Sequence, residues 1–270
     1  MPELAEVKIM SEYINQVSEG KKFVNVRKSD VSKVKTDLKG TWSLGFYIHS
    51  ESRGKELKID ICWKPECFKT HLDGDKTLLC NMGMSGNWSF TETDKTPKHA
   101  HLMFDTDDGW TLSLVDVRRF ARWQWVEGWS KDRGPDPCEQ WGEFVDNVIN
   151  NLNTKEFQKP IYEVLMNQKY FNGIGNYLRA EILYRIRENP LLPAKEFIIK
   201  APSIFLHCHN IPKEAYTIGG GQLKEWTNPF KEDKRTFSEW LKCYGKKEMS
   251  NIIDKNGRKF WYNSKYAISL

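Results

Sequence analysis

The first strongly periodic stretch of the chain covers residues 3–18. Its apolar residues recur at steps of three and four, at Leu4, Val7, Met10, Ile14 and Val17. This spacing places them on one face of an α-helix. Gly20 follows directly and is suited to ending a helix. We therefore expect an amphipathic helix at the start of the chain.

From residue 23 to residue 125 the pattern changes to short alternating runs separated by turn residues. Residues 57–61 and 110–115 are clear examples, because apolar and polar side chains alternate along them. Alternation with a period of two is typical of half-buried strands, and this many short strands predict a sandwich or barrel.

The best candidate for a domain boundary is the breaker cluster at residues 134–137, which reads Gly-Pro-Asp-Pro. Residues 140–190 have helical periodicity beyond it. We expect a domain of helix and β-sandwich over residues 1–130, a linker over 131–137 and a helical domain over 138–270. The predicted fold class is α+β.

The last part of the chain, from about residue 229, combines a short helix with two strand-like runs that end near Tyr262. The runs are separated by Asn256 and Gly257, and Asn-Gly is the strongest short signal for a hairpin with a type I′ turn. We expect such a turn to present Arg258 at its tip.

Composition changes this picture little. The 270 residues carry a net charge of +5 and are 39% hydrophobic, which supports a large core and permits a polyanionic partner. No apolar run approaches the roughly 20 residues of a membrane span, and we expect no secretory signal ahead of the first helix. The six cysteines form no CxxC pair, so we expect reduced, buried thiols in an intracellular protein.

The first candidate for chemistry is the pair Pro2 and Glu3. If Met1 is removed, Pro2 carries a free secondary amine, and an α-amino group that titrates near ~8 is partly nucleophilic at neutral pH. Glu3 is then a carboxylate next to the reacting group. The simpler alternative is an ordinary helix start, at which proline and acidic residues are common.

A second candidate is the stretch 167–185, which reads as helix, glycine turn and helix. Gly173 and Gly175 allow backbone N–H groups to face outward where the second helix begins, and such a helix N-terminus favours a phosphate. Asn176 can cap the helix or contact the phosphate. A plain helical hairpin without ligand is the alternative.

The stretch 167–185 resembles the helix–two-turn–helix motif of the Fpg/Nei family of DNA glycosylases, and most closely its animal endonuclease VIII-like branch. Pro2, Glu3 and Glu6 resemble the start of that family. Three further blocks resemble it in order: Arg53-Gly54-Lys55-Glu56-Leu57, Met82-Gly83-Met84-Ser85-Gly86 and Asp116-Val117-Arg118-Arg119-Phe120.

The resemblance implies a role for each matching residue. Pro2, Glu3, Lys55 and Arg258 would be catalytic. The residues that it implies contact DNA are Glu6, Met84, His99, Arg118, Phe120, Asn176 and Arg258. Among these, Met84, Arg118 and Phe120 would fill the void left by an extruded nucleotide, since a base must leave the duplex before a nucleophile can reach it.

Most of the family has a four-cysteine zinc finger in the last part of the chain, where this sequence has only Cys243. The stretch 256–262 instead resembles a zincless finger, expected at about 240–270 after a helix–two-turn–helix motif at about 155–190. We expect neither metal nor cofactor.

The resemblance therefore implies a bifunctional DNA glycosylase and AP lyase of base excision repair. The expected partner of the monomer is double-stranded DNA that contains oxidised bases or abasic sites. Residues 217–223, at the position of the family's base-contacting loop, match its relatives poorly. A lesion-binding protein of the same fold without chemistry is the alternative. The expected location is the nucleus, or wherever the genome is replicated.

Overall fold

A computed structural model describes residues 2–40, 42–64, 76–221 and 234–267. The chain divides into two compact units. The sandwich unit contains Pro2 and residues 6–129 among those described, and the helical unit contains residues 3–5, 130–221 and 234–267.

The first helix begins and ends close to where the sequence predicts it, since α1 spans Leu4–Ser18. Gly20, at φ +69°, follows it in the left-handed conformation that glycine adopts most easily. Val7, Met10 and Ile14 of α1 belong to the core of the sandwich unit, whereas Leu4 and Ala5 belong to the core of the helical unit.

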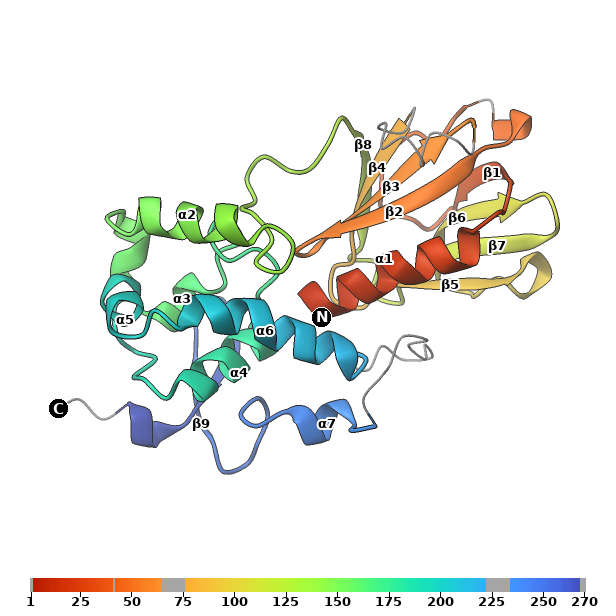
Figure 1. Ribbon diagram of the computed structural model, residues 1–270. Coiled ribbons are helices and arrows are strands. Elements are labelled where there is room, and N and C mark those ends of the chain that lie inside the picture. The colour runs from red at the N-terminus through yellow and green to blue at the C-terminus, as the bar shows by residue number, and fades with distance from the viewer. Residues whose placement is uncertain (1, 41, 65–75, 222–233, 268–270) are drawn as a thin grey trace. The chain divides into compact units, whose positions relative to one another are not determined.

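The sandwich unit has two antiparallel four-stranded sheets, which confirms the predicted class (Figure 1). One sheet has the order β1-β6-β7-β5, and the other has the order β2-β3-β4-β8. The strands are β1 (Phe23–Lys28), β2 (Tyr47–Arg53), β3 (Glu56–Cys62), β4 (Lys76–Asn81), β5 (Asn87–Glu92), β6 (Ala100–Thr106), β7 (Trp110–Val115) and β8 (Arg122–Val126).

The alternating pattern explains how these sheets share a core. Phe104 and Leu112 of one sheet and Leu57 and Ile59 of the other are all fully buried in the same apolar cluster. Because successive strand residues point to opposite faces, each strand supplies every second side chain to this cluster. Burial of these side chains holds the two sheets together.

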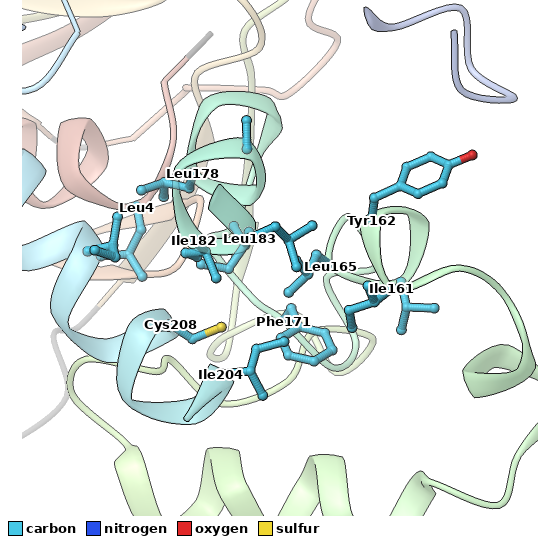
Figure 2. Close-up of a cluster of buried hydrophobic side chains, with 14 of the residues drawn as sticks. Leu4, Ile161, Tyr162, Leu165, Phe171, Leu178, Ile182, Leu183, Ile204 and Cys208 are labelled. Atoms are coloured by element: carbon cyan, nitrogen blue, oxygen red, sulfur yellow. The ribbon is translucent and has the colours of Figure 1, made fainter. Parts of the chain in front are cut away.

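The helical unit is built around six helices and a hairpin among its described residues. The helices are α2 (Trp141–Asn151), α3 (Ile161–Val164), α4 (Asn176–Ile186), α5 (Ala194–Lys200), α6 (Ile204–Thr217) and α7 (Phe237–Trp240), and the hairpin is β9 (Ser250–Ile253) with β10 (Lys259–Tyr262). Helix α4 lies in the centre of the core, where Leu178 and Ile182 pack with Phe171 and Ile204 (Figure 2).

The cysteines depart from expectation at one position. Cys80, Cys138, Cys208 and Cys243 are buried thiols outside any disulfide, as predicted, and burial raises the pKa of the Cys243 thiol to about 12. Cys62, however, is disulfide-bonded. A disulfide depends on two β-carbons lying about 4 Å apart, which sequence spacing does not reveal. Cys67 lies outside the described residues.

Candidate active site and DNA-binding residues

Glu3 lies at the N-terminus of α4. Its carboxylate oxygens accept hydrogen bonds from the main-chain N–H groups of Tyr177, at 3.0 Å, and Leu178, at 3.2 Å. Only 2% of Glu3 is exposed. The carboxylate charge is stabilised both by these bonds and by the positive end of the helix dipole. The predicted helix-terminal anion at these two N–H groups is therefore the protein's own Glu3, which corrects the expectation of a phosphate there.

The glycine turn before α4 is shaped to receive the start of the chain. The carbonyl of Gly173 accepts a hydrogen bond from the Leu4 N–H at 3.1 Å, and its own N–H donates to Gln168 Oε1 at 3.0 Å. Gly173 has φ +89°, a conformation that a side chain would strain. The turn therefore holds Glu3 and Leu4 in place.

Pro2 precedes Glu3 and Glu6 follows it three residues later in the chain, and both are buried. The nitrogen of Pro2 is an amide while Met1 remains attached, and Met1 lies outside the described residues. A nucleophilic role for Pro2 thus requires removal of Met1.

Asn176 is fixed by both of its side-chain polar atoms. Its Nδ2 donates to the Lys259 carbonyl at 3.0 Å, and its Oδ1 accepts from Arg179 Nη2 at 2.5 Å. These contacts join the first residue of α4 to strand β10. Asn176 is therefore oriented by a residue of β10 that lies 83 positions later in the chain.

Arg179 is fully buried and joins α4 to the hairpin loop. Its Nη2 lies 2.9 Å from Asp254 Oδ2, and its Nη1 donates to the Tyr162 carbonyl at 3.1 Å. The guanidinium also lies 5.2 Å from the ring centre of Phe260. Burial lowers the pKa of Arg179, against the opposing effect of Asp254. The Nε atom has no hydrogen-bond partner among the described residues.

Asp254 organises the tip of the hairpin. Its Oδ1 accepts from the N–H groups of Asn256, at 2.9 Å, and Arg258, at 3.0 Å. Burial alone would raise the pKa of Asp254, but hydrogen bonds from the Arg258 N–H and from Arg179 together lower it. The side chain of Arg258 is exposed.

The expected type I′ turn is wrong. That turn needs positive φ at both central residues, and here Gly257 is at φ +74° while Asn256 has no positive φ. The Asp254 N–H donates to the Arg258 carbonyl at 2.9 Å, so the loop contains three residues rather than two. The carboxylate of Asp254 favours this longer loop because it accepts the N–H groups of Asn256 in the loop and of Arg258 directly after it.

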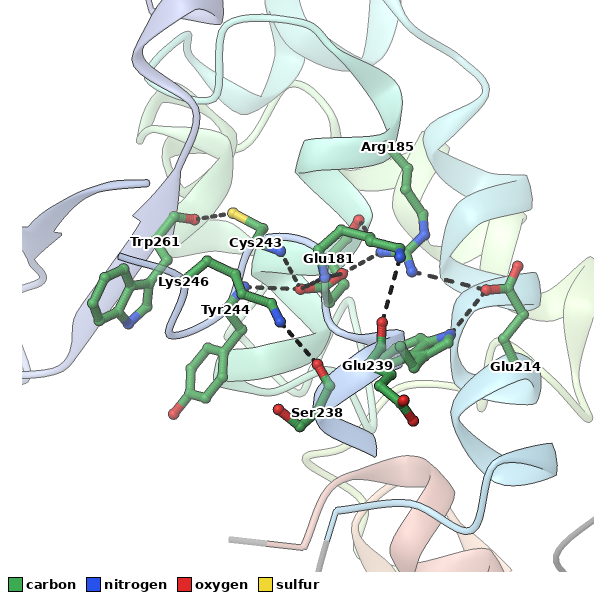
Figure 3. A network of polar contacts seen from close by, with 11 residues as sticks. Glu181, Arg185, Glu214, Ser238, Glu239, Cys243, Tyr244, Lys246 and Trp261 are labelled. Carbon is green, nitrogen blue, oxygen red and sulfur yellow. Dashed lines mark hydrogen bonds and ion pairs between the residues drawn. The ribbon is translucent and has the colours of Figure 1, made fainter. Parts of the chain in front are cut away.

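Glu181 holds the chain that leads into the hairpin (Figure 3). Its buried carboxylate accepts from three consecutive N–H groups, those of Lys242, Cys243 and Tyr244, at 2.8 to 3.2 Å. Arg185 contacts the same carboxylate. The predicted zincless finger is thus held by α4 through two buried side chains, Glu181 and Arg179.

The sequence reasoning missed Arg179, Glu181 and Asp254. The helical pattern gave no signal for Arg179 and Glu181, because both lie beside the stripe formed by Leu178 and Ile182 and are nevertheless buried in α4. A charged residue that is fully buried must be paired. The partners, however, lie 61 to 75 residues away and follow only from the fold.

The sandwich unit carries the other predicted residues. Lys55 lies in the turn between β2 and β3 and is partly exposed. His99 is half-buried, and its carbonyl accepts a hydrogen bond from the Asp116 N–H at 2.9 Å. His101 is buried against Ser29 and the Asp116 carbonyl, and burial lowers its pKa.

Met84, Arg118 and Phe120 lie on two loops of the sandwich unit, after β4 and after β7. Met84 is 46% exposed and Phe120 is 42% exposed. The guanidinium of Arg118 lies 4.7 Å from the ring centre of Phe120. The structure thus brings Arg118 and Phe120 together as an exposed, stacked pair.

Three further expectations concern a metal site, the base-contacting loop and membrane-spanning helices. Within the described part of the chain, no group of three or more His, Cys, Asp or Glu residues is placed to hold a metal ion. Of the predicted base-contacting stretch 217–223, Gln222 and Leu223 lie outside the described residues. No helix in the described ranges is long and apolar enough to cross a membrane.

Sequence comparison finds relatives of both units. Residues 1–123 match the formamidopyrimidine-DNA glycosylase N-terminal domain, and residues 233–266 match the DNA-binding domain of endonuclease VIII-like 1. Endonuclease 8-like 1 of Homo sapiens is 34% identical over 97% of this chain and 72% of its own length. Formamidopyrimidine-DNA glycosylase of Zymomonas mobilis is 29% identical over 91% of this chain and 89% of its own length.

Solved structures share the fold. The MutM (Fpg) protein of Thermus thermophilus superposes with a TM-score of 0.75 at 21% identity, and 98% of each chain is covered. Fpg of Lactococcus lactis, in a complex with DNA containing an oxidised pyrimidine, superposes with a TM-score of 0.76 at 21% identity over 98% of this chain and 99% of that one.

The sandwich, the glycine turn before α4 and the hairpin finger thus define a protein with the fold of the formamidopyrimidine-DNA glycosylases. At the level of sequence, the chain belongs to the family of endonuclease 8-like and formamidopyrimidine-DNA glycosylase proteins, as its resemblance to Fpg/Nei indicated.

Proposed function

We propose that this protein is a bifunctional DNA glycosylase and AP lyase that removes oxidised bases during base excision repair. The observation that carries the proposal is the position of Glu3, whose carboxylate is held at the N-terminus of α4 next to Pro2 in the chain. The match to the glycosylase N-terminal domain, which begins at residue 1, supports a role for this end of the protein.

The proposed reaction begins at Pro2 after Met1 has been removed. The secondary amine attacks C1′ of the damaged nucleotide, the bond from C1′ to the base breaks, and the base leaves with a proton. The nitrogen and C1′ are then joined by a single bond. This bond becomes an iminium when the bond between C1′ and the ring oxygen O4′ breaks and O4′ takes up a proton. Glu3 donates and accepts protons at the sugar during ring opening. Its fixed position suits this role because the proton carrier must stay within hydrogen-bond reach.

The lyase steps follow from the iminium. Its positive charge acidifies C2′, so that loss of a proton there expels the 3′ phosphate by breaking the bond between C3′ and oxygen. A second elimination expels the 5′ phosphate. Lys55 assists elimination as a cation that can also transfer a proton. The product is a one-nucleotide gap.

Each unit contributes a separate part of the proposed DNA contact. Asn176 and Arg258 of the helical unit bind phosphates that flank the lesion, and the Arg258 guanidinium can donate two parallel hydrogen bonds to one phosphate. Glu6 and His99 of the sandwich unit are further proposed contacts to DNA. Met84, Arg118 and Phe120 of the sandwich unit replace the stacking of the extruded nucleotide.

We further propose that the substrates are oxidised pyrimidines and further-oxidised guanine products. The protein would act on DNA in the nucleus or wherever the genome is replicated. The domain division proposed for these activities is a catalytic part at 1–130, a linker at 131–137 and a DNA-binding part at 138–270. The similarity to endonuclease 8-like 1 over 97% of this chain supports this substrate class.

The decisive experiment is borohydride trapping on a duplex that contains an oxidised pyrimidine. The chain with a free Pro2 is expected to form a covalent adduct with the DNA and to cleave the lesion strand. A matched chain that retains residues ahead of Pro2 should form no adduct but should still bind an abasic-site duplex. If the chain with a free Pro2 binds abasic DNA tightly yet forms no adduct, the protein is a lesion-binding protein without chemistry.

A further inference from the structure

The side chains proposed to fill the void lie on two loops that are joined by a single buried carboxylate. Asp116 follows β7 and is 1% exposed. Its Oδ1 accepts a hydrogen bond from Ser85 Oγ at 2.5 Å, and Ser85 is the neighbour of Met84. The same carboxylate is bonded to the loop that carries Arg118 and Phe120.

The bonds to that second loop are all made by main-chain N–H groups. Asp116 Oδ1 accepts from Arg118 N at 3.1 Å, and Oδ2 accepts from Phe120 N at 2.6 Å and Ala121 N at 2.7 Å. Four donors therefore converge on one ion. Burial opposes the charge of Asp116, but the bond from Ser85 and these N–H groups outweigh it and lower its pKa.

The loop needs this support because its backbone is strained. Arg119 has φ +57°, a left-handed conformation that is unfavourable for arginine. The Arg119 N–H donates to the Asp116 carbonyl at 3.1 Å, and His101 Nε2 contacts the same oxygen at 3.1 Å. The carboxylate and the main-chain carbonyl of Asp116 thus both restrain the loop that contains Arg119.

The two loops also touch directly at a position that admits no side chain. A β-carbon on Gly83 would lie 2.8 Å from the carbonyl carbon of Phe120. Gly83 and Ser85 are the residues directly before and after Met84. The close approach and the Asp116 carboxylate therefore set the position of Met84 relative to the stacked pair Arg118 and Phe120.

We propose that Asp116 is a positioning residue for base extrusion, which holds the two loops in the arrangement that enters the DNA. The inference rests on the proposed function and deepens it. Two loops that are already ordered lose little conformational entropy when their side chains enter the duplex, whereas two mobile loops would have to be ordered at that step. Asp116 acts through Met84, Arg118 and Phe120 and does not itself touch DNA.

Asp116→Asn is the sharpest test, because it keeps the size of the side chain but replaces one acceptor oxygen by an NH₂ group. Either the pair Phe120 and Ala121, or the pair Ser85 and Arg118, then loses its acceptor. The matched control is Asp105→Asn. Asp105 is a carboxylate of the same unit that binds Arg27, Asn25 and Thr111 and has no part in the loops.

The readout compares two substrates for each variant. One is a duplex that contains an oxidised pyrimidine beside 2-aminopurine, whose fluorescence reports unstacking, and the other is a single-stranded abasic site, which leaves no void to fill. We expect Asp116→Asn to lower kcat/KM on the duplex by about tenfold to a hundredfold and to slow the fluorescence change. Trapping on the single strand should stay within about twofold, and Asp105→Asn should change the ratio of the two activities little.

Equal losses of Asp116→Asn on both substrates, or undiminished activity on the duplex, would overturn the proposal. If that variant does not fold, Ser85→Ala decides, since it removes only the bond between the loops. Ser85→Ala is expected to slow duplex turnover by roughly twofold to fivefold, and unchanged turnover would overturn the proposal. Absence of activity in the unaltered protein on both substrates would instead reject the proposed function.

Discussion

Glu3 accepts a hydrogen bond from the main-chain N–H of Tyr177 at 3.0 Å, across 174 positions of sequence. The second oxygen of the same carboxylate accepts from Leu178. The start of the chain thus serves as the N-terminal anion of a helix in the middle of the helical unit. Stability and the proposed chemistry depend on the same side chain.

Glu3→Gln should separate these two roles. Glutamine retains one acceptor oxygen, so only one of the two N–H groups keeps its bond, and the protein should lose about 1–2 kcal/mol of stability. Excision should fall by at least about a hundredfold if Glu3 is the proton carrier. Thermal unfolding and single-turnover excision measure the two effects.

Glu12→Gln is the control for this variant, because Glu12 lies in α1, the helix that follows Glu3, and its carboxylate forms an ion pair with Lys8 at 3.5 Å near the surface. It should leave excision and abasic-site binding unchanged. A Glu3→Gln protein that excises at the normal rate contradicts the proton-carrier role, whatever its stability.

The buried pair Arg179 and Asp254 should contribute strongly to stability. Arg179→Met leaves Asp254 with its two N–H donors but without its cation, and loss of one partner of a buried pair costs about 3–5 kcal/mol. The double variant Arg179→Met with Asp254→Asn should be more stable than the sum of the two single losses predicts. Urea unfolding followed by tryptophan fluorescence measures this coupling.

Lys200→Met provides the comparison, since Lys200 and Glu196 form a half-exposed pair on α5. Its effect should be within about 0.5 kcal/mol. If Lys200→Met and Arg179→Met lower the free energy of unfolding equally, the buried pair contributes no more to stability than the half-exposed pair.

Asp254 should also make the free energy of unfolding depend on pH. The folded pKa of Asp254 is below its ordinary value, so its ionised form stabilises the fold above the ordinary pKa. This contribution is lost as pH falls through the folded pKa. The stability difference between the unaltered protein and Asp254→Asn should therefore shrink below about pH 4. A difference that stays constant from pH 7 to pH 3 would contradict the assignment.

Arg258 should contribute one phosphate contact to DNA binding. Arg258→Gln is expected to reduce the slope of log affinity against log salt by about one, because one fewer counterion is released. Arg258→Lys should keep the slope but bind more weakly, since a lysine cannot donate the paired bonds of a guanidinium. Fluorescence anisotropy on an abasic duplex at four salt concentrations distinguishes the two variants.

Gly83→Ala should be the most damaging of three glycine substitutions. Gly83 has φ +58° and lies against Phe120, whereas Gly109 has φ +87° in open space and Gly128 has open space alone. We expect a loss of about 2 kcal/mol or more at Gly83, about 1 kcal/mol at Gly109 and almost none at Gly128. A melting series of the three variants tests this order, and a Gly83→Ala protein as stable as Gly128→Ala would contradict the close approach.

Much of the fold follows from local pattern. The helix at α1, the alternating strands and the short strands of the finger were all visible in the sequence, because periodicity and turn residues act over a few positions. The local Asn256-Gly257 pattern also predicted the wrong turn type. Its length is set by the carboxylate of Asp254, which accepts N–H groups from the loop.

The sequence by itself determined the elements, the family and the residues that could carry chemistry, among them Pro2, Glu3 and Arg258. Only the tertiary structure decided how such residues are held. Glu3 meets α4 over 174 positions, Arg179 meets Asp254 over 75 and Ser85 meets Asp116 over 31. These pairings depend on burial, since a buried charge is stable only when packing brings a partner to it, and packing is not written in any short stretch of sequence.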